Sequence, residues 1–451
     1  MISPNQITIK QGFSDKLFSQ VSNSPLILFR FLFGAVLFYH FFAALFNGHI
    51  FHRYIEPPFT FSYIGFEFLQ PLPGNGMYFY YGLMAFFALC VMFGAWYRFS
   101  IVAVASMWTV VYLMQKADYN NHYYLVLLLC WIMVFSPANR SASVDVKRGK
   151  VTATDTCYQY CIWIFIAQIA IVYFFAGISK LSPDWLSGKF IEIQFSRMTT
   201  HQYVGILYQQ KWFQLSICYA GLIFDLLIVP LLIWKPTRNA ALLLSCLFHL
   251  FNSYTFQIGI FPYLAIALNV FFLDGSFVNR FFFRRSVAPE LSLKTISLTN
   301  KKITISVLVL YFLFQLIIPM RSWFFPGNVY WTEEGYRMSW KLMIRTKSGN
   351  VYFKVKDPAT GQIWKVDPKE KFSASHMLWL SISPDIIWQY AQKLKKEYQA
   401  KGHTSVEVYA IGWVSLNRGQ AMPMVDTSVN LAKVKWESFQ HSGWITERPK
   451  N

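Results

Sequence analysis

Charged residues are scarce in this sequence, and that scarcity indicates the class of protein. Only 14% of the 451 residues are Asp, Glu, Lys or Arg, against about 25% in an average soluble protein. In their place, 55% of the residues are hydrophobic and 19% are aromatic. The composition predicts a polytopic membrane protein and argues against an ordinary soluble domain.

Acidic residues are fewer than basic ones. The sequence has 22 Asp and Glu against 41 Lys and Arg, which gives a formal net charge of +19. In a soluble protein this excess would suggest a nucleic-acid partner. No basic module with interleaved aromatic residues is present, so we expect no nucleic acid. We assign the excess charge to cytoplasmic loops and to contact with membrane lipid.

Cysteine is also sparse, and none of the six follows Cys246. All six lie in or beside apolar runs, so we expect small buried side chains rather than disulfides or a metal site. The one N-glycosylation sequon, at Asn139, falls in a loop expected inside the cell. A C-terminal region without cysteines or sequons favours a bacterial periplasm over the lumen of the endoplasmic reticulum.

Long apolar runs predict about nine transmembrane helices within residues 26–319, because a bilayer core needs about 20 mainly apolar residues per helix. Residues 1–25 do not resemble a cleavable signal peptide and are expected to be cytoplasmic. We place a break at Asn252 and Ser253, where polar residues interrupt the apolar run. The expected spans are Leu26–Phe46, Met77–Trp96, Ile101–Met114, Tyr123–Ser136, Cys161–Ile178, Leu215–Trp234, Ala240–Asn252, Phe256–Leu273 and Ile303–Pro319.

The charges between the spans predict the orientation. Lys and Arg gather in the loops 140–150, 235–238 and 280–302, which the positive-inside rule places in the cytoplasm. Nine spans then put residues 320–451 outside the membrane. The loops expected on the outer side carry Glu56, Glu67, Asp118, Asp184 and Glu192.

Residues 320–451 are polar and predict an extramembrane domain of mostly β character. The stretches Asn350–Lys356 and Val406–Leu416 alternate as strands do. Residues 383–400 predict an amphipathic helix, with Ser383 as its N-cap and Pro384 in its first turn. We expect one apolar face on this helix, made of Ile387, Tyr390, Ala391, Leu394 and Tyr398.

Polar residues from three expected helices fall at the same outer membrane face. Asn121 and His122 begin one span, Lys180 ends the next, and His249 and Asn252 end a third. Each has a plain structural reading, since a lysine at a helix end reaches the interface and Asn or His can satisfy helix termini. Their convergence favours a functional site, because ionisable residues at membrane depth are costly.

The residue types at this face suggest base chemistry on a lipophilic acid. An apolar setting disfavours the charged form of an amine, so Lys180 can act as a general base near neutral pH. A hydroquinone would fit such a pocket, and His and Asn side chains could hydrogen-bond its oxygens. Two charged residues stand apart. Arg30 is expected to extend to the inner interface, and Asp225, near midspan, has no identifiable partner.

The motifs also resemble a known family, the vitamin K-dependent gamma-glutamyl carboxylases and their bacterial homologues. The stretches that carry the resemblance occur in the family's order along nearly the whole chain. They are FRFLFG (29–34), NNHYYL (120–125), YFFAGISKLSPDWLSG (173–188), FHLFNSYTFQIGIFPY (248–263) and YWTEEGYRMSWKLM (330–343).

The resemblance implies a reaction and its participants. Vitamin K hydroquinone, from phylloquinone or menaquinone, is deprotonated by Lys180. It is then epoxidised with O2, while CO2 is added to a glutamate of a peptide or protein substrate. No metal is implied. His122 is implied to be catalytic, and Asn121, His249 and Asn252 to line the reaction centre. The residues implied to bind the substrate glutamate are Tyr336, Ser339, Trp340 and Arg345, with Arg345 pairing its carboxylate.

The sequence departs from the animal members of the family in three ways. It lacks the cysteine needed for their disulfide between the membrane part and the outer domain, it is shorter at the C-terminus, and its glutamate-recognition segment differs in its charged positions. Two alternatives therefore stay open. One is a quinol epoxidase or oxidoreductase that does not carboxylate peptides, and the other is a non-enzymatic membrane module for transport or assembly.

Overall fold

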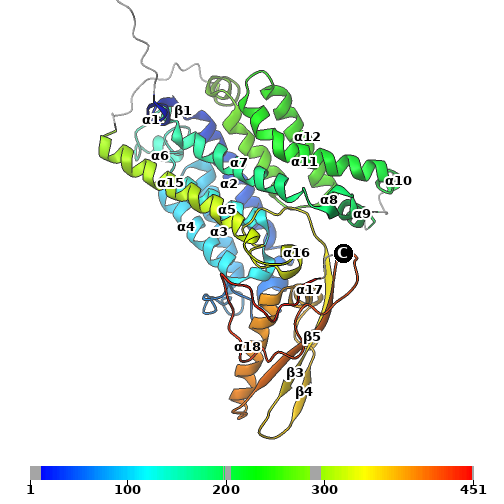
Figure 1. Ribbon diagram of the computed structural model, residues 1–451. Helices are drawn as coiled ribbons and strands as arrows, with labels where there is room; N and C mark the ends of the chain where they lie inside the picture. The colour runs from blue at the N-terminus through cyan, green and yellow to red at the C-terminus, as the bar shows by residue number, and fades with distance from the viewer. Residues whose placement is uncertain (1–11, 197, 199–204, 285–295, 449–451) are drawn as a thin grey trace, which may run out of the picture.

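The computed structural model describes residues 12–196, 198, 205–284 and 296–448. The chain forms a bundle of helices with a smaller C-terminal domain at one end (Figure 1). The short helix α1 (Phe13–Leu17) lies at the other end of the bundle. Helix α1 and the C-terminal domain therefore lie at opposite ends of the helical bundle.

Each expected span corresponds to helical structure, but the count of nine membrane crossings is not confirmed. Six helices are long and apolar enough to cross a membrane, and a seventh crossing results if the bent pair Phe261–Phe272 and Gly275–Phe283 is one span. The six are α2 (Ser24–Ala44), α3 (Gly76–Phe93), α4 (Tyr97–Met114), α7 (Tyr160–Ser179), α11 (Lys211–Ile233) and α15 (Leu298–Met320).

The remaining expected spans fall short for identifiable reasons. Helix α5 (Asn121–Phe135) is apolar but short. Helix α12 (Arg238–Phe256) is long enough but carries buried polar residues, among them Ser245, His249 and Asn252. Helix α13 (Phe261–Leu268) passes into a 3-10 turn, η3 (Asn269–Phe272). In α12, polar side chains that face the protein interior lower the mean hydropathy, so this helix does not qualify as a membrane span.

The break expected at Asn252 lies further along the chain. Helix α12 continues to Phe256, and the chain then turns through Gln257 and Gly259, whose φ angles are 49° and 65°. Glycine adopts this left-handed conformation without a steric penalty, so Gly259 permits the turn into α13. Asn252 consequently keeps its helical place on the same helix as His249.

Several bundle helices leave apolar side chains uncovered by the rest of the chain. On α15 the buried residues are only Gln315 and Pro319. Its exposed residues include Ile303, Val307, Leu310, Phe314 and Ile317. A continuous apolar surface of this kind is typical of contact with lipid. The structure thus supports a multi-pass membrane protein.

Arg30, expected from the sequence to extend to the inner interface, is buried within the protein. Its side chain is buried in the bundle and donates hydrogen bonds to the carbonyl oxygens of Ala138 at 2.9 Å and Ala142 at 2.7 Å. A third donation goes from Nε to the carbonyl of Met92. The guanidinium is directed to the loop after α5, on the expected inner side, but it finds its acceptors within the protein and holds this loop against α2 and α3.

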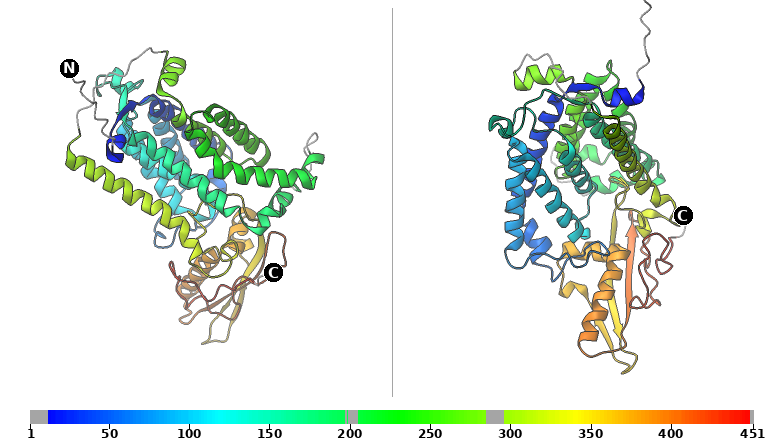
Figure 2. Two further views of the ribbon diagram at one scale, coloured as in Figure 1. Left: turned by 45° about the horizontal axis from the view of Figure 1, so that its top comes forward. Right: turned by 90° about the vertical axis from the view of Figure 1, so that its left-hand side faces the viewer.

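The C-terminal domain is a mixed α and β structure. Strands β3 (Lys347–Lys356), β4 (Ile363–Val366) and β5 (Glu407–Leu416) form an antiparallel sheet in the order β4-β3-β5. Phe353 in the central strand pairs with Val366 on one side and Ala410 on the other. Helices α17 (Ala374–Ile382) and α18 (Pro384–Ala400) pack beside the sheet (Figure 2).

The sequence predicted the parts of this domain better than its overall class. The two expected strands and the expected helix are confirmed, and the predicted apolar face of α18 is buried. The mostly β character was wrong, because α17 and α18, with 9 and 17 residues, match the strands in extent. Ser383 precedes α18, but its hydroxyl donates to Glu333 Oε2 instead of capping the helix.

A buried ion-pair cluster joins the domain to the bundle. Asp385 Oδ2 of α18 forms an ion pair with Lys116 Nζ at 2.6 Å and accepts a hydrogen bond from Arg337 Nη1 at 2.7 Å. Lys116 lies in the turn between α4 and α5, and its side chain is only 1% exposed. Burial raises the pKa of Asp385, but Arg337 and Lys116 outweigh this and hold it well below its usual value. Ion pairs thus hold the C-terminal domain against the bundle, and this domain has no cysteine to form a disulfide.

We predict that Asp385→Asn destabilises the junction, because it leaves Lys116 and Arg337 buried without a counter-charge. Removing one partner of a buried pair costs about 3–5 kcal/mol. Thermal unfolding of the purified protein in detergent should show a clearly lowered midpoint. The carboxylate has a lowered pKa in the folded state, so its contribution is complete above about pH 4 and is lost as the pH falls further.

Glu397→Gln is the matched control, since Glu397 lies on the same helix and pairs with Lys371 at 3.1 Å in a more exposed place. Exposed pairs contribute about 0–1 kcal/mol, so its midpoint should stay near that of the wild type. Equal midpoints for Asp385→Asn and the wild type would contradict the structural role of this cluster.

Candidate active site

A cavity of about 590 Å³ lies where the bundle meets the C-terminal domain. Its wall is largely aromatic and apolar, with polar groups at a few places. Helices α5, α7, α11 and α12 line it, together with the segment 341–345 that leads into β3. Seven of the nine residues singled out from the sequence line it: Asn121, His122, Lys180, His249, Asn252, Tyr336 and Arg345.

Lys180 is paired, which the sequence did not reveal. It follows the last residue of α7, and its Nζ forms an ion pair and hydrogen bond with Asp225 Oδ2 from α11. Both residues line the cavity, and each is only 6% exposed. The Trp185 ring centroid lies 5.1 Å from the same Nζ. A carboxylate and an aromatic face therefore both contact the lysine Nζ.

The close approach of α7 and α11 depends on Gly177. A Cβ atom at this position would lie 2.5 Å from Leu226 Cδ2 and 2.8 Å from its Cγ. Small residues let membrane helices pack closely. Because Gly177 precedes Lys180 by less than one turn and Leu226 follows Asp225, this contact brings the lysine and the aspartate together.

The two histidines occupy different settings in the cavity wall. His249 Nε2 lies 2.8 Å from the hydroxyl of Tyr173, which also lines the cavity. Its other nitrogen, Nδ1, is buried and has no hydrogen-bond partner within the described ranges. His122 packs its ring against Tyr123, with ring centroids 4.6 Å apart. An orphaned buried nitrogen beside a cavity is available to a polar atom of a ligand.

A chain of hydrogen bonds ties the start of α5 to the segment after the last span. Asn121 Nδ2 donates to the carbonyl of Lys341 at 3.1 Å, and Tyr119 donates its hydroxyl proton to Asn121 Oδ1 at 2.8 Å. The same Tyr119 oxygen accepts from the amide of Met338. Asn121 therefore connects the bundle to the outer segment; the N-cap of α5 is Asn120, so Asn121 is not the helix cap.

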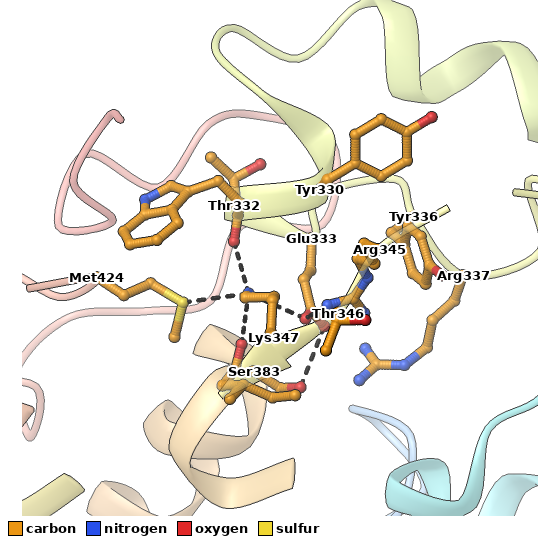
Figure 3. A network of polar contacts seen from close by, with 12 residues as sticks. Tyr330, Thr332, Glu333, Tyr336, Arg337, Arg345, Thr346, Lys347, Ser383 and Met424 are labelled. Atoms are coloured by element: carbon orange, nitrogen blue, oxygen red, sulfur yellow. Dashed lines mark hydrogen bonds and ion pairs between the residues drawn. The ribbon is translucent and has the colours of Figure 1, made fainter. Parts of the chain in front are cut away.

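Arg345 already has a carboxylate partner in the chain. Its Nη1 lies 2.7 Å from Glu333 Oε1, and its guanidinium carbon lies 4.2 Å from the Tyr336 ring centroid. Lys347 contacts the same Glu333 at 3.1 Å and also donates to the carbonyls of Trp331 and Ile382. Figure 3 shows Glu333 between the two cations, with Tyr336 beside Arg345.

One donor of Arg345 remains open. Its Nε is buried and has no hydrogen-bond partner among the residues that the structure describes. Arg345 also lines the cavity, so a carboxylate could bind this donor while Glu333 keeps the guanidinium in place.

Two residues expected at the site lie outside the cavity wall. Trp340 is buried and stacks on Tyr124 of α5, with centroids 5.0 Å apart. Ser339 donates its hydroxyl proton to the carbonyl of Tyr336. Met338, Trp340 and Met343 all have positive φ angles. Such backbone is strained for residues other than glycine, and these packing contacts help to fix it.

Sequence reasoning missed three further groups in the wall. The sequence shows Asp225 as a midspan charge but does not identify Lys180 as its partner. Tyr173 and Lys341 were given no role. Burial lowers the pKa of Lys341 to about 8, and this side chain is 7% exposed. Within the described residues, no group of three or more His, Cys, Asp or Glu side chains could hold a metal ion.

We predict that Gly177→Val destabilises the protein, because the added side chain would collide with Leu226 and separate α7 from α11. Overpacking of this kind costs about 1–3 kcal/mol. The thermal midpoint in detergent should fall. Gly82→Val in α3 is the matched control, since nothing lies within 4 Å of a Cβ added there. Similar midpoints for both variants would contradict the close packing of the two helices.

Comparisons with known proteins agree with this two-part arrangement. A family model described as the HTTM domain matches residues 18–277. A second, described as the vitamin K-dependent gamma-carboxylase lumenal domain, matches residues 300–451. No solved structure matches the chain. The two family models follow one another as the helical bundle and the C-terminal domain do, and the chain belongs to the vitamin K-dependent gamma-carboxylase family.

Proposed function

We propose that this protein carboxylates glutamate residues of a peptide or protein, using vitamin K hydroquinone, O2 and CO2, and releases the quinone epoxide. One observation carries the proposal. A single cavity is lined both by Lys180, His122 and His249 of the bundle and by Tyr336 and Arg345 of the outer segment. A lipophilic hydroquinone can enter such a cavity from the membrane, and a peptide from the outer side.

The residues present suit a hydroquinone. The cavity offers aromatic walls for the rings, and the unpartnered Nδ1 of His249 offers a polar contact for an oxygen. Asn252 and Asn121 add amide groups to the same wall. When bound, the hydroquinone supplies the oxygen-dependent chemistry that generates the base for the glutamate γ-carbon.

The chain's own residues bind, orient and move protons. Lys180 takes the proton of the quinol hydroxyl. His249, held by Tyr173, and His122 orient the reacting groups, with Asn121 and Asn252 beside them. Arg345 receives the substrate carboxylate through its open Nε, and Tyr336 packs on the guanidinium. Ser339 and Trp340 act indirectly, by holding the shape of this segment.

The orientation that we propose follows from the same arrangement. The N-terminal end lies in the cytoplasm, and the C-terminal domain lies outside the membrane, in a bacterial periplasm. Two findings support this: α1 and the C-terminal domain lie at opposite ends of the bundle (Figure 1), and the matching family model is named for a lumenal domain.

We predict that Lys180→Ala loses both products. General acid–base catalysis contributes about 10²–10⁴-fold, so epoxide formation should fall by at least about 100-fold. The assay uses purified protein with hydroquinone, O2, labelled bicarbonate and a short glutamyl peptide, and it measures epoxide and peptide-bound label together. Lys211→Ala, at an exposed lysine of α11, should retain both products. Epoxide formed at the wild-type rate by Lys180→Ala would remove Lys180 from the mechanism.

We predict that Arg345→Lys weakens peptide binding without abolishing epoxide formation. Lysine preserves the charge toward Glu333 but removes the Nε donor, so KM for the glutamyl peptide should rise about tenfold, or about 1.4 kcal/mol. Epoxide formation without peptide should be unchanged. Arg418→Lys, at an exposed arginine of the same domain, is the control. An unchanged KM would show that Arg345 serves only the Glu333 pair.

A second candidate is a quinol epoxidase that does not carboxylate peptides. The pairing of Arg345 with Glu333 favours it, because the expected carboxylate receptor is partly occupied. It predicts epoxide in the assay above with no label in any glutamyl peptide. A non-enzymatic transport or assembly module predicts neither product.

A further inference from the structure

The Lys180–Asp225 pair raises the question of where the quinol proton ends. The carboxylate of Asp225, from α11, is in ion-pair and hydrogen-bond contact with Lys180 Nζ, and both residues line the cavity. Among the described residues, Lys180 has no other acidic partner and Asp225 no other basic one within ion-pair distance. The two groups must therefore be considered as one unit.

The two side chains of the pair are in ion-pair contact, as an ammonium and a carboxylate. Either charge alone would be costly in this apolar wall, but each compensates the other in direct contact. The Trp185 ring lies over the same amine, with its centroid 5.1 Å from Nζ. An ammonium has no lone pair, so Lys180 in this state cannot accept a proton unless it gives one up.

We infer that Asp225 is the final acceptor of the quinol proton, which reaches it through Lys180. This rests on the proposed function and adds a catalytic residue to it. As the quinol O–H bond breaks, an N–H bond forms at Nζ. Another N–H bond of Nζ breaks, and an O–H bond forms at Asp225 Oδ2. No electrons leave the pair. The summed charge of the quinol, Lys180 and Asp225 is zero before and after, and the lysine remains an ammonium beside the new oxyanion.

The relay explains why both residues are held so firmly. Gly177 lets α7 approach α11, so the donor and acceptor stay in hydrogen-bond contact. Tyr173, which also lines the cavity, has its hydroxyl in hydrogen-bond contact with His249. Asp225 accepts its hydrogen bond from Lys180. A lysine that acted alone would need no carboxylate in this position.

The experiment compares Asp225→Asn with the wild type, with Asp225→Glu to test rescue. Asparagine keeps the shape and an acceptor oxygen but cannot take the proton. We expect kcat for epoxide formation to fall by at least about 100-fold in Asp225→Asn, with KM for the hydroquinone little changed, and to recover partly in Asp225→Glu. Glu192→Gln, from an exposed pair with Lys211, is the control and should match the wild type.

A second readout does not depend on turnover. Under anaerobic conditions, infrared difference spectra recorded on adding vitamin K hydroquinone should show a new protonated-carboxyl band in the wild type. Asp225→Asn should lack this band. A near-normal kcat in Asp225→Asn overturns the inference whatever the spectra show. A reduced kcat with no carboxyl band in the wild type also overturns it, because Asp225 would then only position Lys180.

The proposed function can fail separately. If the wild-type protein forms no epoxide while its thermal unfolding shows that it is folded, the proposed function is wrong. If the wild type forms epoxide, the variants and the spectra decide the role of Asp225 alone.

Discussion

The contact between Lys180 and Asp225 is the interaction on which the site depends. Two charges sit in an apolar wall, and each is tolerated because the other touches it. This requirement fixes how α7 and α11 must pack, and Gly177 provides the space. The helices in turn place Trp185 beside the lysine and set one wall of the cavity. A buried lysine–aspartate pair is thus held together by a packing constraint between two membrane helices.

The second constraint is the attachment of the outer domain. Asp385 binds both Lys116, in the turn before α5, and Arg337, in the segment after α15. From these points hydrogen bonds continue through Tyr119 to Asn121, next to His122 in the cavity. The outer domain therefore does more than cover the site. It helps to hold the start of α5, and it supplies Tyr336 and Arg345 to the same cavity.

Much of this arrangement could be predicted from local pattern. Apolar runs correctly predicted helices, and alternating polar and apolar residues predicted β3 and β5. The helical spacing of apolar residues in α18 predicted which of its faces is buried. Polar residues on three separate helices were expected at one membrane face, and the structure brings them around one cavity. In each case neighbouring residues in the sequence carry the information, because helices and strands repeat over short distances.

The rest depends on contacts distant in sequence. Asp225 and Lys180 are 45 positions apart, and only helix packing pairs them. Glu333 and Arg345 pair across a strained segment, so the expected substrate ligand proved to have a partner already. The count of nine spans is not confirmed, because α5 is short and α12 carries polar residues for the interior, which lower its hydropathy. Functional residues are where local patterns are expected to mislead.

We propose that one cavity couples quinol oxidation to glutamate carboxylation. The most direct test is the incorporation of labelled CO2 into a glutamyl peptide by the purified wild-type protein, with hydroquinone and O2 each supplied or withheld. The account predicts peptide-bound label only when both are present, together with epoxide. Epoxide without label across a series of glutamyl peptides, or label that appears without hydroquinone, would contradict the coupling.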